Sequence, residues 1–305
     1  MSTAAVPHYS GLENAMKWLL RILAGLVALV VLLVVFVFVT LRPTMPETQF
    51  QLRAPERVGD KHVLLFGATG KLGLELAADL TARGDRVTAF VRNVSIAPEY
   101  VDAVQANLNA DDAVLETLDP AVVKIISKLR VRDSLGAMGI LFVSGDAVNK
   151  ADVEAAFAAG EYDAVITTIG NIRADPPPDY IGNANIFDAA KAAGVQRVIL
   201  VSTIGAGDSL KAAPFISRLG LSAVIPLKTQ AEDHLRASGL DYTIVRPGGL
   251  PFAPPTGNGI LSEDPKTMGF IVRGDLARLI VGVLDDDRTI GKTLAAMDPT
   301  IKSPF

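Results

Sequence analysis

The chain has 305 residues, half of them hydrophobic, and a formal net charge of −4. Because basic residues are not in excess, a nucleic-acid-binding surface is not expected. The absence of cysteine excludes disulfides, thiolate metal sites and cysteine nucleophiles. The three histidines, His8, His62 and His234, form no metal-binding spacing, so no metal site is predicted.

The N-terminal region contains a long apolar segment. It follows a tail over residues 1–21, and from Ile22 to Leu41 it has no charged residue. About 20 consecutive apolar residues are enough for a helix to span a bilayer, whereas a cleaved signal peptide has a shorter apolar core. We therefore expect one uncleaved transmembrane helix over 22–41, with the lipid bilayer as a partner and a single-pass membrane location.

The rest of the chain is predicted to be a linker followed by one domain. Residues 42–60 contain several prolines among polar residues and lack helical or strand periodicity, which is typical of a linker. Over 61–305, strand and helix patterns alternate, and this predicts an α/β domain with a parallel sheet. Strands are predicted at 63–66, 86–91, 139–143, 162–168, 197–202, 241–245 and 292–297, and helices at 71–83, 152–159, 180–193, 227–238 and 274–284.

An insertion interrupts this alternation. Asn93 to Ala137 separates the second and third predicted strands by far more than such a connection needs. Helical patterns cover 98–108, 111–118 and 120–131, and Asp119 is a predicted N-cap before Pro120. We expect an ordered helical insertion over 93–137, whose role the sequence does not specify.

A glycine-rich loop follows the first predicted strand and is the strongest functional motif. Glycines let the backbone turn tightly and approach a pyrophosphate, which binds at the N-terminus of the next helix. The last glycine also lets that helix pack closely on the strand. A glycine-rich turn without a ligand is the alternative. The loop predicts dinucleotide binding by Gly67, Ala68, Thr69, Gly70, Lys71, Leu72 and Gly73.

The end of the second predicted strand suggests which dinucleotide binds. Arg92 follows this strand, and no acidic residue is present there to accept hydrogen bonds from a ribose 2′-hydroxyl. A guanidinium pairs well with a 2′-phosphate, and Lys71 adds a second positive charge. We therefore predict that NADP(H) is preferred over NAD(H), although either side chain is alternatively a solvated surface cation.

The other strand ends supply the remaining candidates, because ligands bind at the carboxyl ends of strands in such sheets. Asp146 either binds the adenine amino group or caps a turn. Residues 167–170 are expected beside the adenine ribose, and Ser202 beside the nicotinamide. The cofactor-binding candidates at these ends are Asp146, Ala147, Thr167, Thr168, Ile169, Gly170 and Ser202.

Several motifs, taken in order, resemble those of the atypical short-chain dehydrogenase/reductases. They are GATGKLG, FVRN, SGDAVNKADVEAAF, VITTIG, ANIFDAAKAAGVQRVILVST, KTQAEDHLRASGLDYTIVRPGGL and GDLARLIVGVL. The chain is most similar to the NAD(P)H-binding group that includes flavin/biliverdin reductase-like proteins and photosystem assembly factors. The resemblance covers 61–297 except the insertion. It implies a Rossmann fold, a doubly wound parallel sheet with helices on both faces, here preceded by one transmembrane helix.

The resemblance also implies a catalytic Tyr-x-x-x-Lys pair, in which the tyrosine donates a proton and the lysine holds the ribose. Lys228 matches the lysine, but Val224 occupies the tyrosine position and has no proton to give. Ser202 matches the catalytic serine. The catalytic candidates are therefore Ser202 and Lys228, and Lys228 is also a cofactor-binding candidate.

Two functions follow from these motifs. The first is a membrane-anchored oxidoreductase that acts on a small or lipid-soluble acceptor, with a substrate pocket formed by 204–225 and 248–270. The second is a non-catalytic NADP(H)-binding scaffold, sensor or assembly factor for a membrane protein complex. Charges on both sides of the apolar segment are balanced, but dinucleotides are abundant in the cytosol, so we expect the domain to be cytoplasmic.

Overall fold

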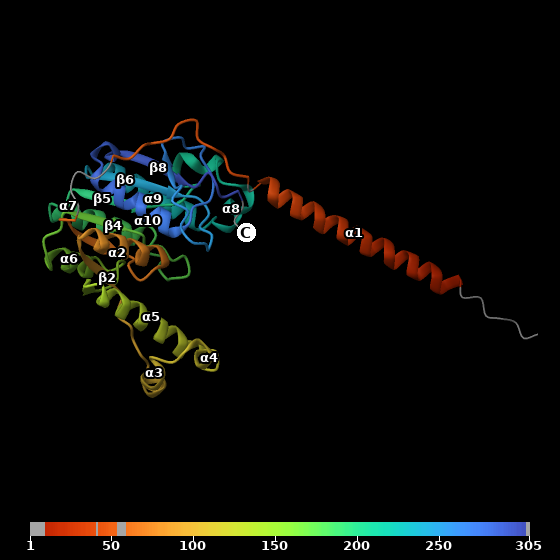
Figure 1. Ribbon diagram of the computed structural model, residues 1–305, viewed down its shortest axis with the longest axis horizontal. Helices are drawn as coiled ribbons and strands as arrows, with labels where there is room; N and C mark the ends of the chain where they lie inside the picture. The colour runs from red at the N-terminus through yellow and green to blue at the C-terminus, as the bar shows by residue number, and fades with distance from the viewer. Residues whose placement is uncertain (1–9, 41, 54–58, 303–305) are drawn as a thin grey trace, which may run out of the picture. The chain divides into compact units, whose positions relative to one another are not determined.

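The computed structural model describes residues 10–40, 42–53 and 59–302 (Figure 1). The chain divides into two compact units, Met1–Arg42 and Pro43–Phe305. Parts of the expected segments lie outside the described residues. They are residues 1–9 of the tail, residue 41 at the end of the expected transmembrane helix, residues 54–58 of the linker, and residues 303–305.

The first unit contains helix α1, Ser10–Thr40. Over the described ranges, no helix combines the length and the apolarity that a membrane crossing requires. Because a span takes about 20 consecutive apolar residues in one helix, this finding corrects two predictions. They are the transmembrane helix over 22–41 and the single-pass membrane location. The bilayer as a partner stays a prediction.

The second unit is built on an eight-stranded sheet with the order β3-β2-β1-β4-β5-β6-β8-β7. All neighbouring strands are parallel except β7 and β8, which are antiparallel. The first six strands have the order typical of a doubly wound dinucleotide-binding sheet, which confirms the predicted Rossmann fold. The strands are β1 (His62–Phe66), β2 (Arg86–Val91), β3 (Leu141–Ser144), β4 (Ala164–Thr167), β5 (Arg197–Val201), β6 (Asp241–Pro247), β7 (Ile260–Ser262) and β8 (Lys292–Met297).

Helices cover both faces of the sheet, because side chains alternate between the faces along each strand. Val63 and Leu65 of β1 belong to one buried cluster, and Leu64 and Phe66 belong to the other. The helices over the first face are α2 (Lys71–Arg83) and α10 (Arg273–Asp285), and those over the second are α6 (Lys150–Ala158), α7 (Ile181–Ala192) and α9 (Val224–Ala237).

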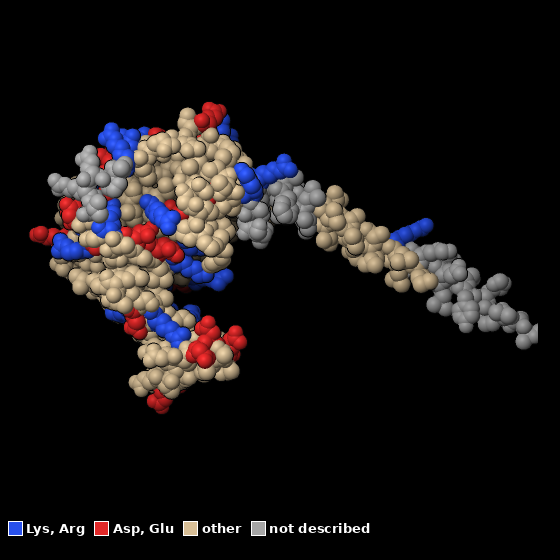
Figure 2. Space-filling view, in the orientation of Figure 1, with Lys and Arg blue, Asp and Glu red and all other residues tan. Residues whose placement is uncertain are grey.

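The insertion folds into helices near β2, on the side of the sheet whose edge strand is β3 (Figure 1). Asp119 caps α5, as expected, by accepting a hydrogen bond of 2.7 Å from the backbone N–H of Ala121. On the face shown in Figure 2, acidic and basic side chains are interspersed over the second unit. The helices of the insertion are α3 (Val101–Asn107), α4 (Asp112–Leu115) and α5 (Pro120–Ala137), preceded by the short helix η1 (Pro98–Tyr100).

Some elements of the second unit were not expected from the sequence. Part of the expected linker pairs with the domain, since Thr44 forms an antiparallel bridge with Met268, and Phe50 forms one with Leu261. Leu52 packs against the first apolar cluster. Strand β7 was also unexpected, as were the short helices η2 (Gly207–Lys211), α8 (Phe215–Gly220) and η3 (Asp287–Thr289).

We expect Gly73→Ala to lower the free energy of unfolding by about 1–3 kcal/mol, because the added methyl group forces backbone movement. A Cβ at Gly73 would lie 2.1 Å from the carbonyl oxygen of Gly67. Gly136→Ala is the control, since a Cβ there would lie 3.8 Å from its nearest neighbour. Alanine is favoured over glycine in helices. Urea denaturation measures both variants, and a similar destabilisation of the two would contradict the close packing at Gly73.

Candidate functional site

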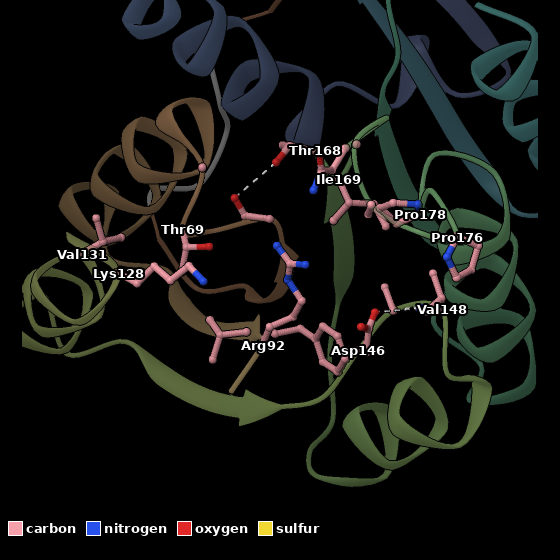
Figure 3. A pocket seen from close by; sticks show the side chains of 18 of the residues that line it. Thr69, Arg92, Lys128, Val131, Asp146, Val148, Thr168, Ile169, Pro176 and Pro178 are labelled. Carbon is pink, nitrogen blue, oxygen red and sulfur yellow. Dashed lines mark hydrogen bonds between the residues drawn. The ribbon is translucent and has the colours of Figure 1, made fainter. Parts of the chain in front are cut away.

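A cleft of about 890 Å³ lies at the carboxyl ends of β1, β2, β3 and β4 (Figure 3). The strand order reverses at β1, and ligands bind at such a switch point in open α/β sheets. The described residues that line the cleft are Gly67, Thr69, Gly70, Phe90, Val91, Arg92, Lys124, Ser127, Lys128, Val131, Asp146, Ala147, Val148, Thr168, Ile169, Gly170, Asn171, Ala174, Asp175, Pro176 and Pro178.

The backbone of the glycine loop forms one side of this cleft. Gly67 has a φ of 89°, which favours glycine, and a Cβ there would lie 2.4 Å from Oγ1 of Thr168. Gly70 is the N-cap of α2, and its N–H donates to the carbonyl oxygen of Gly67 at 2.9 Å. The loop that leads into the N-terminus of α2 therefore lines the cleft, and the first N–H groups of a helix, which have no partner within the helix, are the groups that bind a pyrophosphate.

The two cations predicted at the adenosine end lie in different surroundings. Arg92 lines the cleft, and Figure 3 shows its guanidinium pointing into the space between Thr69 and Thr168. Lys71 instead contacts an aromatic side chain: its Nζ lies 4.0 Å from the ring centroid of Phe252. Arg273 lies over the same ring at 4.6 Å. Arg92 is thus the predicted cation that lines the cleft.

Asp146 caps a turn, which is one of the two roles predicted for it. Its carboxylate accepts a hydrogen bond of 3.2 Å from the N–H of Val148, and its own N–H donates to Asp152 at 2.8 Å. The side chain is exposed and lines the cleft. One carboxylate oxygen is therefore bound by the turn, while the residue also faces the ligand side.

The end of β4 forms the opposite wall. Thr168, Ile169 and Gly170 line the cleft, as predicted. Thr167 is buried and points instead to α7, where its hydroxyl donates to the side-chain oxygen of Asn183 at 2.8 Å. The predicted contact of residues 167–170 with a ligand is therefore limited to the last three residues.

A buried ion pair lies directly behind Gly170. Lys228 and Asp179 are 6% and 2% exposed, and their Nζ and Oδ1 atoms are 3.7 Å apart. The ammonium donates to the carbonyl oxygen of Ile169 at 2.7 Å, and Asp179 accepts from the N–H of Asn171 at 2.8 Å. Burial lowers the pKa of Lys228, and the charge of Asp179 opposes this shift.

The position of this pair gives Lys228 a supporting role. A Cβ on Gly170 would lie 2.7 Å from Oδ1 of Asp179 and 3.2 Å from Nζ of Lys228. The charged groups therefore contact the backbone that forms the cleft wall, and they hold it through the carbonyl of Ile169 and the N–H of Asn171.

The expected catalytic positions lie just after the carboxyl end of β5 and in the first two turns of α9. The hydroxyl of Ser202 is buried and has no hydrogen-bond partner among the described residues. Val224 is the first residue of α9, one turn before Lys228, and it carries no acidic proton. Ser202 is thus a predicted catalytic residue whose buried hydroxyl has no partner among the described residues.

Nine of the predicted residues line the cleft, and the insertion contributes residues that were not predicted. The predicted ones are Gly67, Thr69, Gly70, Arg92, Asp146, Ala147, Thr168, Ile169 and Gly170. Ala68, Lys71, Leu72, Gly73, Thr167, Ser202 and Lys228 are described but are outside that lining. Lys124, Ser127, Lys128 and Val131 were missed, although their spacing puts them on one face of a helix.

Comparison with known proteins agrees with this geometry. A family model described as NAD(P)H-binding matches residues 121–287. An uncharacterised chloroplastic protein of Arabidopsis thaliana is 32% identical over 76% of this chain and 74% of that protein. The chloroplastic protein TIC 62 of Oryza sativa is 30% identical over 78% of this chain. The matched region is about half (48%) of the length of TIC 62.

A solved structure is also similar. The structure of ChuY, an anaerobillin reductase from Escherichia coli O157:H7, has a TM-score of 0.62 and 27% sequence identity to this chain. The match covers 79% of this chain and 99% of ChuY. Nearly the whole fold of ChuY is therefore shared with this chain.

We expect Asp179→Ala to lower the free energy of unfolding by about 3–5 kcal/mol, because it leaves the Lys228 ammonium buried without its counter-charge. Asp188→Ala is the matched control, since Asp188 pairs with His234 but its side chain is 54% exposed. Exposed pairs contribute about 0–1 kcal/mol. Equilibrium urea denaturation measures both variants, and equal losses would show that the buried pair has no special structural role.

Proposed function

Because the chain belongs to the NAD(P)H-binding family of atypical short-chain dehydrogenase/reductases, we propose that it binds NADP(H) in the cleft at the ends of β1–β4 and prefers it to NAD(H). The observation that carries this proposal is that the glycine loop and Arg92 line the same cleft. The loop offers backbone N–H groups to a pyrophosphate, and the guanidinium offers paired donors to a 2′-phosphate.

The residues of the site fit a dinucleotide. Side chains are excluded at Gly67 and Gly170, where a Cβ would overlap Thr168 and Asp179, so a ligand meets bare backbone on both walls. Ser202 supplies a buried hydroxyl without a partner among the described residues. Thr69 and Arg92 would hold the phosphates, and the backbone of Thr168–Gly170 would lie along the adenine ribose.

Replacing the cleft arginine tests the cofactor preference. We expect the full chain to bind NADPH more tightly than NADH, and Arg92→Ala to weaken NADPH binding about tenfold while NADH binding changes less than about twofold. One charged hydrogen bond is worth about that much. Titration monitored by nicotinamide fluorescence measures the Kd values.

Arg86→Ala is the matched control, because Arg86 is an exposed arginine at the opposite end of the same strand. It should leave both Kd values unchanged. Equal affinity of the unsubstituted chain for NADPH and NADH would reject the preference, and absence of binding to either would reject the cofactor site.

We propose that the activity is a hydride transfer to a small or lipid-soluble acceptor. Bound NADPH supplies the hydride in this chemistry. The proposal is supported by the family and by the similarity to ChuY, which is a reductase. In this chain Ser202 would hold or donate the proton at its Oγ, because the position expected for a tyrosine is Val224. Lys228 would hold the cleft wall through Ile169.

A second function is a non-catalytic NADP(H)-binding scaffold, sensor or assembly factor for a protein complex. The observation that favours it is Val224, which leaves the start of α9 without a proton donor. In this case the cleft would bind the cofactor and no acceptor would be reduced.

Turnover separates the two functions. NADPH oxidation by the full chain is measured against quinone, flavin and aldehyde acceptors. If the chain is a reductase, Ser202→Ala should lower kcat about a hundredfold, because a positioned general acid contributes at least that much. Tight NADPH binding without oxidation of NADPH by any acceptor class would instead favour the scaffold.

A further inference from the structure

Helix α5 of the insertion forms one wall of the cofactor cleft. Lys124, Ser127, Lys128 and Val131 line the cleft together with Arg92. The four α5 residues are spaced i, i+3, i+4 and i+7, so they occupy one face of the helix. The insertion therefore contributes to the site itself.

Packing holds this wall in place. Near its C-terminal end, α5 buries Leu135 in the same apolar cluster as Val91 of β2. In its first half, Val122 and Ile126 form a separate buried cluster with Val104 of α3. Arg130 adds hydrogen bonds to the carbonyl oxygens of Leu108, at 2.7 Å, and Ala110. Both halves of the helix thus have fixed partners.

The cations of the cleft form no ion pair with the described residues. Lys124, Lys128 and Arg92 are exposed, and none of them has an ion-pair partner among the described residues. Figure 3 shows the Lys128 side chain reaching from α5 toward Thr69 and Arg92. The acidic residues that line the cleft are Asp146 and Asp175, and Asp146 already accepts a hydrogen bond from the turn at Val148.

We propose that Lys124 and Lys128 bind the adenosine 2′-phosphate together with Arg92, so that the insertion sets the preference for NADP(H). This inference rests on the proposed function. A phosphate monoester carries about −1.5 to −2 charges and three acceptor oxygens. A guanidinium satisfies two of these oxygens in a bidentate contact, and the ammonium groups bind the third and neutralise the remaining charge.

The placement of the insertion supports the same assignment. The pyrophosphate has its own donors at the N-terminus of α2, through the loop that contains Thr69 and Gly70. The insertion begins directly after Arg92, at the strand end that faces the adenosine 2′ position in such sheets. Its cations therefore meet the one additional anionic group that distinguishes NADPH from NADH.

The test replaces both lysines in the full chain, as Lys124→Ala/Lys128→Ala, and measures Kd for NADPH, NADH, 2′,5′-ADP and 5′-AMP. We expect the affinities for NADPH and 2′,5′-ADP to fall about tenfold or more, and those for NADH and 5′-AMP to change less than about twofold. The salt dependence of NADPH binding should also decrease, since screening acts on the charges that were removed.

Two controls accompany this variant. Lys191→Ala removes an exposed lysine of α7, whose Nζ donates to the carbonyl oxygen of Ser238, and should leave all four affinities unchanged. Lys128→Arg keeps the charge and should retain most of the NADPH affinity. Thermal unfolding should be the same for every variant, because the replaced side chains are exposed.

The outcomes separate this inference from the function on which it rests. If the unsubstituted chain prefers NADPH and the double variant keeps that preference, the proposed function stands, but the role of the two lysines is wrong. An equal loss for NADPH and NADH also overturns it and places the lysines at the pyrophosphate. A chain without any preference contradicts both this inference and the NADP(H) preference, and a chain that binds no dinucleotide rejects the proposed function.

Discussion

The close approach of three backbone segments at the glycine loop is the constraint on which the cleft depends. Gly73 of α2 lies against the carbonyl oxygen of Gly67, and Gly67 in turn lies against Thr168 at the end of β4. A methyl group at Gly67 or Gly73 would push apart elements that also carry the sheet core. The same contact places the N-terminus of α2 beside the cleft, so packing and the proposed anion binding have one common cause.

The buried Lys228–Asp179 pair extends this constraint to the opposite wall. Two charges taken out of water are costly unless other groups satisfy them, and here the carbonyl of Ile169 and the N–H of Asn171 do so. The family resemblance implies that the lysine holds a ribose, yet its observed partners hold the chain just after β4. The proposed cofactor site therefore rests on β1–β4, whereas Val224, at the position where the resemblance implies a tyrosine, lies at the start of α9.

The parts of the fold that were predictable are those whose signal is local. The strand β1, the loop 67–73 and α2 follow from apolar periodicity and glycine spacing, and the parallel sheet follows from the alternation of strands with helices. The strand β7 is too short to show a period, and the bridges of Thr44 and Phe50 join segments far apart in sequence. The apolar run 22–41 led to a wrong prediction of the membrane location, since over the described residues no helix is long and apolar enough to span a bilayer.

The wall that α5 contributes to the site was beyond prediction for a related reason. Lys124 and Lys128 have the spacing of an ordinary solvated helix face, and a cleft wall uses the same spacing and the same residue types. Only the packing of Leu135 against the sheet and of Ile126 against α3 shows which way this face points. The second of these clusters is small, with three buried residues, so the first half of α5 depends on it for its position. A ligand that contacts this wall binds only its folded form, and binding therefore stabilises the insertion by mass action. Order in the insertion and the proposed affinity for the cofactor are in this way thermodynamically coupled.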